Sequence, residues 1–193
     1  MTEFTEINET LIPAIETFVL RWGDMGSQWG VNRSVAQIHA LLYVSDKPLT
    51  AENIAALLGI ARSNVSNSLR ELVSWKLIKR VPQLGDRRDH YIAEVDLWEM
   101  VRRIAKGRKE RELDPAAQAL QECIEQASND ERISADTMKR LNNMQDFVHR
   151  VSRWYEQILA LPINKVMLLI NMGDKIANLI DSSPKASNTV KKN

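Results

Sequence analysis

The sequence predicts a mainly α-helical protein with one small two-stranded β-hairpin, and three observations lead to this fold class. Most of the 193 residues lie in stretches whose apolar side chains recur every three to four positions, as on one face of a helix. Strand-like segments occur at 77–83 and 91–95, on either side of the polar loop 84–90. Pro82 has no N–H to donate to a sheet, so the first segment is expected to be an edge strand.

Residues 1–29 are predicted to form an N-terminal helix with a wide apolar stripe. Its apolar positions are Phe4, Ile7, Leu11, Ile15, Phe18, Val19, Trp22 and Met25. Pro13 lies inside this stripe, which indicates either a kink or a helix start near Ile12. Because the stripe is wider than one small domain is expected to cover, we predict that this helix takes part in dimerisation.

Residues 30–96 hold a second pattern, in which a short helix and a longer helix are joined by a tight turn. A separate helix at 33–43 comes first. Thr50 then caps the short helix, Gly59 ends it, and the longer helix follows at 62–75. The buried side of this longer helix is predicted to consist of Val65, Leu69, Leu72 and Val73. A helix-turn-helix followed by a β-hairpin is a winged helix-turn-helix, which we therefore predict for 30–96.

The opposite side of the 62–75 helix carries Ser, Asn and Arg where a surface helix usually carries Glu and Lys pairs. Such side chains reach base edges and phosphates in a DNA major groove. The basic hairpin tip, Arg87 and Arg88, suits a phosphate backbone or a minor groove, and we expect Asp86 to brace an arginine. The predicted DNA-binding residues are Arg62, Ser63, Asn64, Ser66, Asn67, Arg70, Arg80, Arg87 and Arg88. For the helix alone, a solvated Ser- and Asn-rich surface is the alternative.

The charge distribution favours nucleic acid, although the net charge is only +1. Residues 59–90 hold seven basic and three acidic side chains, and residues 102–111 hold six basic and one acidic. A basic zone around the helix-turn-helix within an otherwise acidic chain is typical of a nucleic-acid binder. The second cluster either extends that surface or keeps a helix solvated.

Three segments, in this order, resemble the GbsR-type branch of the MarR-like winged-helix transcriptional regulators. They are GVNRSVAQIHALLYVSDKPL at 30–49, NSLREL at 67–72 and GDRRDHY at 85–91. The chain departs from the family pattern at Ala61, where Ser or Thr usually precedes the recognition helix. The cap of that helix is then expected from Ser63 or from water.

The resemblance implies a link to compatible-solute genes, with choline or glycine betaine as a small-molecule effector. Aromatic side chains bind quaternary ammonium groups through cation–π attraction. The candidate effector-binding residues are Trp22, Trp29, Tyr43 and Trp98. Packing in the core is the alternative for each, because these residues fall at helical spacing.

Residues 97–181 are predicted to form a C-terminal helical region for dimerisation and effector binding, and residues 182–193 a disordered tail. Asp96 can cap its first helix, and Asp114-Pro115 is expected to start another, with Asp114 as the N-cap and Pro115 at the first helical position. The longest helix is predicted at 134–161. It carries a heptad seam that we expect at the dimer interface, made of Leu141, Met144, Val148, Val151, Tyr155 and Ile158.

The sequence offers no catalytic or metal-binding pattern, so we predict no enzyme activity, no cofactor and no metal. His39, His90 and His149 lack Cys or carboxylate neighbours at ligand spacing, and His39 is expected to be a hydrogen-bonded helix residue. The single Cys123 cannot form an internal disulfide, which favours the cytoplasm; it is expected to be buried, with a reactive sensor thiol as the alternative. No apolar run approaches the roughly 20 residues that span a bilayer.

These patterns predict a sequence-specific DNA-binding transcriptional regulator, and we expect a repressor. As a homodimer it would place two recognition helices at half-sites about 10 bp apart on a pseudo-palindromic operator in double-stranded DNA. The alternative is a winged-helix protein–protein interaction module that does not bind DNA specifically.

Overall fold

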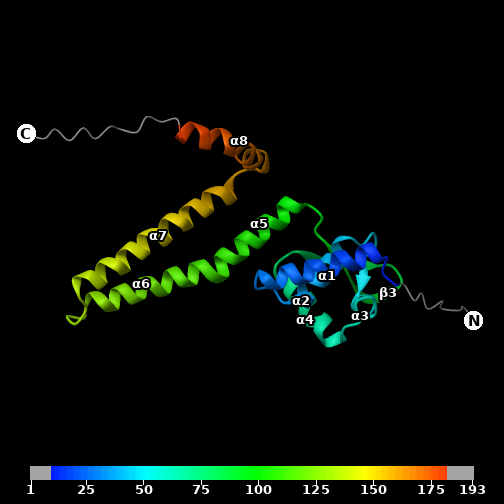
Figure 1. Ribbon diagram of the computed structural model, residues 1–193. Helices are drawn as coiled ribbons and strands as arrows, with labels where there is room; N and C mark the ends of the chain where they lie inside the picture. Colours follow the sequence, from blue (N-terminus) through cyan, green and yellow to red (C-terminus); the bar gives the residue numbers. More distant parts are fainter. Residues whose placement is uncertain (1–9, 182–193) are drawn as a thin grey trace, which may run out of the picture. The chain divides into compact units, whose positions relative to one another are not determined.

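The computed structural model describes residues 10–181, and the chain divides into two compact units at Arg108 and Lys109. We call them the winged-helix unit and the hairpin unit (Figure 1). The predicted fold class is confirmed, because the chain is mainly helical and has one small antiparallel sheet. Phe4 and Ile7 of the predicted stripe, and the tail 182–193, lie outside the described residues.

The winged-helix unit contains five helices and three strands among its described residues. In order they are α1 (Pro13–Gln28), α2 (Arg33–Tyr43), β1 (Leu49–Thr50), α3 (Ala51–Leu58), α4 (Arg62–Ser74), β2 (Ile78–Gln83), β3 (Asp86–Ala93) and α5 (Leu97–Arg108). The sheet is antiparallel in the order β1-β3-β2. The sequence predicts β2 and β3 but not β1, because two residues are too few to show a strand pattern.

Strand β2 pairs only with β3 and is therefore an edge strand, as Pro82 predicts. The regular pairing of β2 with β3 shifts between Val81 and Gln83, on either side of this proline. Gly85 closes the hairpin with φ of 82°, a conformation that glycine adopts without steric cost.

Local side-chain caps set the starts of the helices around the turn. Helix α1 begins at Pro13, so the proline starts the helix and does not kink it. Asn32 caps α2 by accepting a hydrogen bond from the Ser34 N–H at 2.9 Å. Thr50 and Asn53 form a reciprocal capping box at α3, which ends at Gly59 with φ of 62°.

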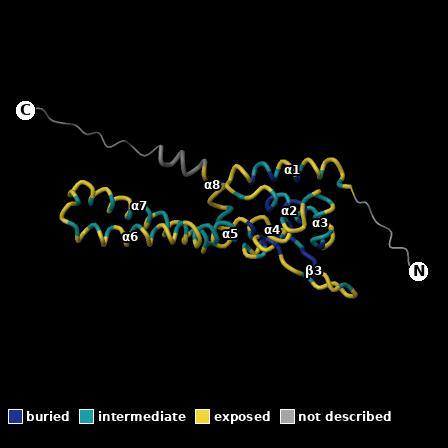
Figure 2. The backbone as a smooth tube through the Cα atoms, turned by 90° about the horizontal axis from the view of Figure 1, so that it is seen from below, coloured by how far each residue is buried: buried dark blue, intermediate teal, exposed yellow. Residues whose placement is uncertain are grey.

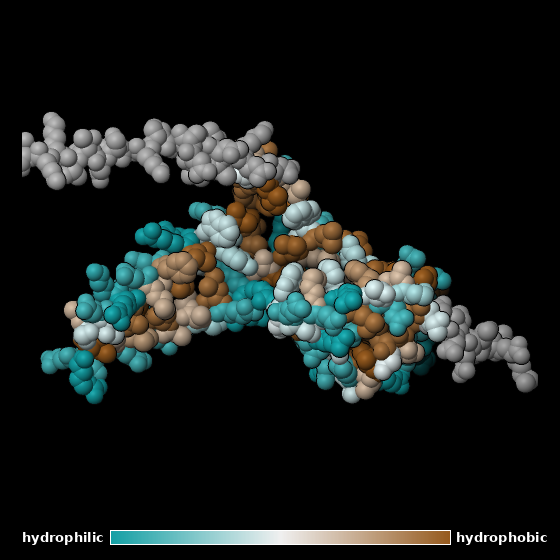
Figure 3. Space-filling view, in the orientation of Figure 1, coloured by the Kyte–Doolittle hydropathy of each residue, from teal (hydrophilic) through white to brown (hydrophobic). Residues whose placement is uncertain are grey.

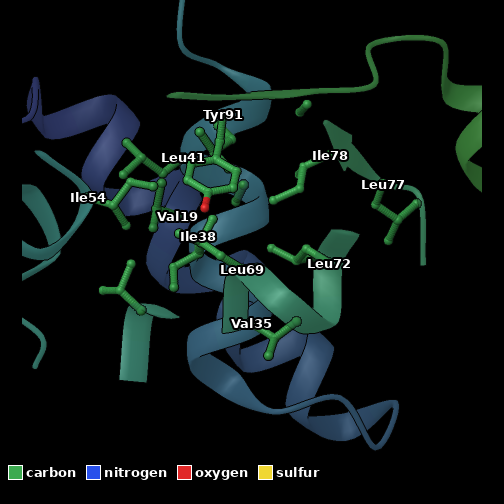
Figure 4. Close-up of a cluster of buried hydrophobic side chains, with 14 of the residues drawn as sticks. Val19, Val35, Ile38, Leu41, Ile54, Leu69, Leu72, Leu77, Ile78 and Tyr91 are labelled. Atoms are coloured by element: carbon green, nitrogen blue, oxygen red, sulfur yellow. The ribbon is translucent and has the colours of Figure 1, made fainter. Parts of the chain in front are cut away.

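The hydrophobic core lies where α1, α2, α3, α4 and the sheet meet (Figure 4). Its side chains include Val19, Val35, Ile38, Leu41, Ile54, Leu69, Leu72, Leu77, Ile78 and Tyr91. Ile38 and Ile54 have no exposed surface, so both are part of a filled interior. The core therefore fixes α4 against α2 and the sheet.

Helices α1 and α2 approach each other closely at Gly26. A Cβ added at Gly26 would lie 2.5 Å from the Cβ of Ala36, so only glycine fits this crossing.

His39 of α2 is buried, and its Nε2 has no hydrogen-bond partner among the described residues, which corrects the expectation that this histidine is hydrogen-bonded. Burial lowers the pKa of His39 to about 4, because the charged ring would lose its hydration.

The hairpin unit begins with a π-helical turn, η1 (Lys109–Leu113), followed by α6 (Asp114–Ser128), α7 (Ala135–Ala160) and α8 (Ile163–Asp181). The expected cap at Asp114 is not formed; η1 leads directly into α6, and the Lys109 ammonium binds the Asp114 carboxylate at 2.7 Å. Helices α6 and α7 pack side by side in opposite directions (Figure 1). Ser134 caps α7 by accepting from the Thr137 N–H at 3.1 Å.

Within α6 and α7 no described residue is buried, whereas buried segments recur through the winged-helix unit (Figure 2). Leu141 and Val148 of the predicted seam are half-buried, and Gln145 between them hydrogen-bonds Gln121 of α6. Met144, Phe147 and Trp154 of α7 are 58%, 67% and 59% exposed. Apolar side chains accordingly reach the surface of this unit (Figure 3).

Cys123 of α6 is exposed, so the expectation of a buried cysteine is wrong. The α6–α7 pair covers only one side of each helix, and Cys123 falls on the uncovered side. In the described part of the chain, no helix has the length and hydropathy needed to cross a membrane.

Candidate nucleic-acid interface

Helix α4 separates an apolar side from a polar side, as the sequence predicts. Val65, Leu69 and Leu72 are buried in the core. Arg62, Ser63, Ser66, Asn67 and Arg70 are exposed together on the outer side. The packing of the apolar side therefore determines which polar residues face outward.

Asn64 differs from the other predicted contact residues because it is held against α2. Its side-chain amide donates to the Ser34 hydroxyl at 2.8 Å, and Ser68 lies 3.5 Å from its Oδ1. Asn64 is half-buried and Ser68 is buried. These contacts give Asn64 a role in fixing α4 on α2, which the spacing of polar residues alone did not reveal.

The first turn of α4 has no side-chain cap. Ala61 occupies the N-cap position, and neither Ser63 nor another described side chain supplies the capping hydrogen bond. The N–H groups of a first helical turn carry a partial positive charge, so an uncapped N-terminus attracts anions. Arg62 stands at this end of the helix and forms an ion pair with Glu52 of α3.

Asn67 and Arg70 lie one turn apart on the exposed side of α4 and are joined by a hydrogen bond. The guanidinium Nη2 of Arg70 donates to the Oδ1 of Asn67. This contact orients both polar groups on the exposed side. Paired amide and guanidinium groups of this kind match the hydrogen-bonding edges of adenine and guanine.

The β2–β3 hairpin carries three of the predicted arginines, and each has a different setting. Arg88 binds Asp86 through its Nε, 3.0 Å from both carboxylate oxygens, which confirms that Asp86 braces an arginine. This contact also holds the pKa of Asp86 well below its usual range. Arg80 lies 3.4 Å from Asp89, whereas Arg87 is exposed and has no carboxylate within 4 Å among the described residues.

His90 is buried in β3, and its ring contacts Arg88 and Asp86 near the turn of the hairpin. Its Nδ1 lies 3.0 Å from the Arg88 carbonyl oxygen, and its Nε2 lies 3.5 Å from the Asp86 carboxylate. The ring therefore supports the segment 86–88 from inside. The tip itself projects from the winged-helix unit as an exposed hairpin (Figure 2).

The second basic cluster, at 102–111, is largely engaged within the chain. Arg103 binds Glu94 and Glu99, both at 2.9 Å. Lys109 binds Asp114 at 2.7 Å and Glu156 at 3.0 Å. These contacts favour a structural role for the cluster over an extension of the α4 surface.

The four aromatic residues predicted to bind an effector are not brought together in one box. Trp22 is half-buried, with its ring centroid 5.5 Å from that of Phe18, and Tyr43 also packs against the core. Trp29 is 66% exposed at the end of α1, and Trp98 of α5 is 39% exposed. Each residue therefore has its own structural setting within the winged-helix unit.

No group of three or more His, Cys, Asp or Glu side chains that could hold a metal ion occurs in the part of the chain that the structure describes. The exposed polar side of α4 and the basic tip of the β2–β3 hairpin are the two candidate functional surfaces.

Comparison with known proteins finds that residues 29–89 match the MarR family. YvaV of Bacillus subtilis (strain 168), provisionally named an HTH-type transcriptional regulator, is 23% identical over 86 residues, which cover 45% of this chain and 49% of YvaV. OpcR of the same organism, named an HTH-type transcriptional repressor, is 24% identical over 71 residues, covering 37% of this chain and 38% of OpcR. This chain thus spans half or less of the length of these curated relatives.

A crystal structure of a transcriptional regulator has a similar fold, with a TM-score of 0.61 at 18% identity. The similarity covers 76% of this chain and 96% of that chain. It extends beyond residues 29–89 and supports the mainly helical fold with a small sheet.

Proposed function

We propose that this chain is a sequence-specific DNA-binding transcriptional regulator, because its residues 29–89 match the MarR family and the same segment folds as a winged helix. One observation carries the proposal: α4 presents Asn67 and Arg70 outward from a helix with an uncapped, basic N-terminus. In this proposal α4 enters the major groove, and the β2–β3 hairpin contacts phosphates or the minor groove. The proposed contacts of α4 are Arg62, Ser63, Ser66, Asn67 and Arg70, while Asn64 of α4 holds the helix against Ser34 of α2.

The proposal is tested by salt titrations of variants on a selected duplex and on a random duplex. Asn67→Ala or Arg70→Ala should lose roughly 1–3 kcal/mol on the selected duplex and much less on the random one. Equal losses on both duplexes would remove α4 as the element that reads sequence. No salt-dependent binding by the wild type would favour the alternative, a winged-helix module that binds another protein.

The role of the β2–β3 hairpin in DNA binding is tested separately, because Arg87 and Arg88 differ in their ion-pair partners. Arg87→Ala should weaken binding to both duplexes and lower the salt slope by about one unit, since one phosphate contact is lost. Arg88→Ala should do the same to a smaller extent, because Asp86 already neutralises this guanidinium. An unchanged slope for both variants would make the hairpin a structural element only.

We further propose that the protein acts as a homodimer. Support comes from the hairpin unit, where no described residue of α6 or α7 is buried while Phe147 and Trp154 are exposed. Ile12, which precedes α1, and Leu20 of α1 are also exposed, at 69% and 42%. Sedimentation should show a dimer at micromolar concentration that Phe147→Ser weakens; a monomeric wild type would contradict this part of the proposal.

We also propose that the protein is a repressor of the GbsR type that controls compatible-solute genes. The name of OpcR as a repressor and the resemblance of the segments at 30–49, 67–72 and 85–91 support this. Choline or glycine betaine should then raise the melting temperature and change DNA affinity by reciprocal coupling. No thermal shift at millimolar ligand would remove these two effectors from the proposal.

A further inference from the structure

One carboxylate lies among the cations of the proposed DNA-binding surface, and the proposed function gives it no role. Glu52 is the second residue of α3, and it forms an ion pair with Arg62 at the start of α4. Both side chains face solvent, with 42% of Glu52 and 66% of Arg62 exposed. The pair therefore lies on the surface and not in the core.

The Glu52 carboxylate lies where a negative charge is favoured, in the first turn of α3 and beside Arg62. The pKa of Glu52 is lowered by its own backbone N–H, which is the largest cause, and by the Arg62 guanidinium. A backbone N–H at a helix start and an arginine are also groups that proteins use to bind a DNA phosphate.

The start of α3 lies beside the β2–β3 hairpin. The pairing of β1 with β3 places Thr50 opposite His90, two residues from Arg88 on the same strand. The pKa of Arg88 is raised mainly by its hydrogen bond to Asp86, and Glu52 adds a smaller electrostatic contribution. Glu52 therefore pairs with a cation of α4 at an element that adjoins the hairpin strand.

We propose that Glu52 is an intramolecular competitor of DNA phosphate for Arg62, and that it thereby weakens non-specific binding. This inference rests on the proposed DNA-binding function. In the free protein Arg62 is already neutralised, so a phosphate that reaches it must displace Glu52 or lie beside its charge. At a preferred site, contacts of Asn67 and Arg70 with bases offset this cost, whereas at random sites nothing does. Glu52 therefore increases discrimination between the two.

The test substitutes Glu52→Gln in the full chain, which removes the charge but keeps the length of the side chain. Binding to a random-sequence duplex should become roughly three- to tenfold tighter near 0.1 M salt, with a salt slope steeper by about one unit, because Arg62 is then free for a phosphate. Binding to a duplex selected by the wild type should tighten less, so the ratio of the two affinities should fall.

Asp130→Asn is the matched control. It also removes one carboxylate from an exposed arginine pair, Asp130–Arg132, but in the turn between α6 and α7. It changes the net charge equally and should leave the salt slope at the wild-type value. In an Arg62→Gln background, the effect of Glu52→Gln should shrink to the size of this control.

Two results would overturn the inference while leaving the proposed function intact. Glu52→Gln could match Asp130→Asn on the random duplex, in which case Glu52 does not compete with phosphate. It could instead bind both duplexes more weakly, in which case Glu52 positions Arg62 for DNA. If the wild type itself shows no salt-dependent DNA binding, the proposed function fails and the inference fails with it.

Discussion

The winged-helix unit and the hairpin unit are both rich in helices, but they differ in how their apolar side chains are placed. In the winged-helix unit, helices α1 to α4 and a sheet enclose side chains such as Ile38 and Ile54 completely. In the hairpin unit, two long helices cover each other on one side only, and Phe147 is 67% exposed. Burial of apolar surface is the main favourable contribution to folding, and among the residues whose burial is described only the first unit has a buried core.

This difference teaches that helical pattern and burial are separate properties of a sequence. The heptad spacing of α7 is as regular as the patterns of α2 and α4, yet it does not create an interior within one chain. The same spacing serves a core in one unit and an open surface in the other. The following predictions test this contrast, from the largest expected effect to the smallest.

The largest effect on stability is expected from truncating one buried leucine, with one exposed leucine of the other unit as its control. Leu72→Ala in α4 should lower the free energy of unfolding by about 2–5 kcal/mol, because it leaves a cavity in a packed core. Leu168→Ala in α8 should change it by no more than about 0.5 kcal/mol, because this side chain is 57% exposed. Urea unfolding followed by circular dichroism measures both, and equal losses would mean that Leu168 is buried in the assembled protein.

Acid should destabilise the winged-helix unit through His39. Its pKa is lowered to about 4 in the folded state from 6.5, so the unfolded chain binds the proton more readily. The stability that neutral His39 provides is complete above pH 6.5 and is lost as the pH falls towards 4, by up to about 3 kcal/mol.

Thermal unfolding between pH 7 and pH 4 measures this loss, and His39→Leu should make the curve flatter. His149 of α7 is exposed, so His149→Gln should leave the curve unchanged. If His39→Leu lost stability in acid as steeply as the wild type, the loss would have to come from other groups.

Two glycines are expected to respond to alanine with opposite signs. Gly26→Ala should cost about 1–3 kcal/mol, because the new Cβ would meet the Cβ of Ala36 and force α1 and α2 apart. Gly173→Ala in α8 should raise stability by up to about 1 kcal/mol, since its Cβ meets nothing within 4 Å and alanine favours the helix. The melting temperatures of the two variants measure these changes. Destabilisation by both variants would indicate that other side chains pack against Gly173 of α8 in solution.

The smallest effects are expected at helix caps. Ala61→Ser should stabilise the winged-helix unit by about 1 kcal/mol by supplying the cap that α4 lacks. Ser134→Ala should destabilise the hairpin unit by a similar amount, about 1 kcal/mol, by removing the cap of α7. Thermal unfolding measures both variants, and no gain for Ala61→Ser would show that the first turn of α4 is already satisfied by solvent.

The sequence was sufficient to predict the elements of the winged-helix unit because each has a local cause. Thr50 and Gly59 mark the ends of α3, Pro82 marks an edge strand, and the spacing of Val65, Leu69 and Leu72 defines the buried side of α4. Each of these signals depends on residues a few positions apart. The exposed positions of α4 followed from the same spacing.

The remaining features depend on contacts between distant segments and could not be read from local patterns. The hydrogen bond of Asn64 to Ser34 joins residues thirty positions apart, and the Glu52–Arg62 pair joins two helices across a turn. The missing partner of His39 and the exposure of Cys123 likewise depend on what packs nearby. Helix α6 starts at Asp114-Pro115 as predicted, but the π-helical turn before it leaves Asp114 without the expected capping role.

The unpaired side of β2 has a consequence for crowded conditions. An open strand edge invites the edge of another molecule to join it, which is a common route to aggregation. Here Pro82 removes one N–H from that edge, the pairing shift distorts it, and Lys79 and Arg80 place charge along it. A sheet cannot easily grow from this strand into a neighbouring molecule. At high protein concentration, contacts between copies are therefore expected through their helices and not through β2. The β2–β3 hairpin then stays free to bind DNA even where the protein is abundant.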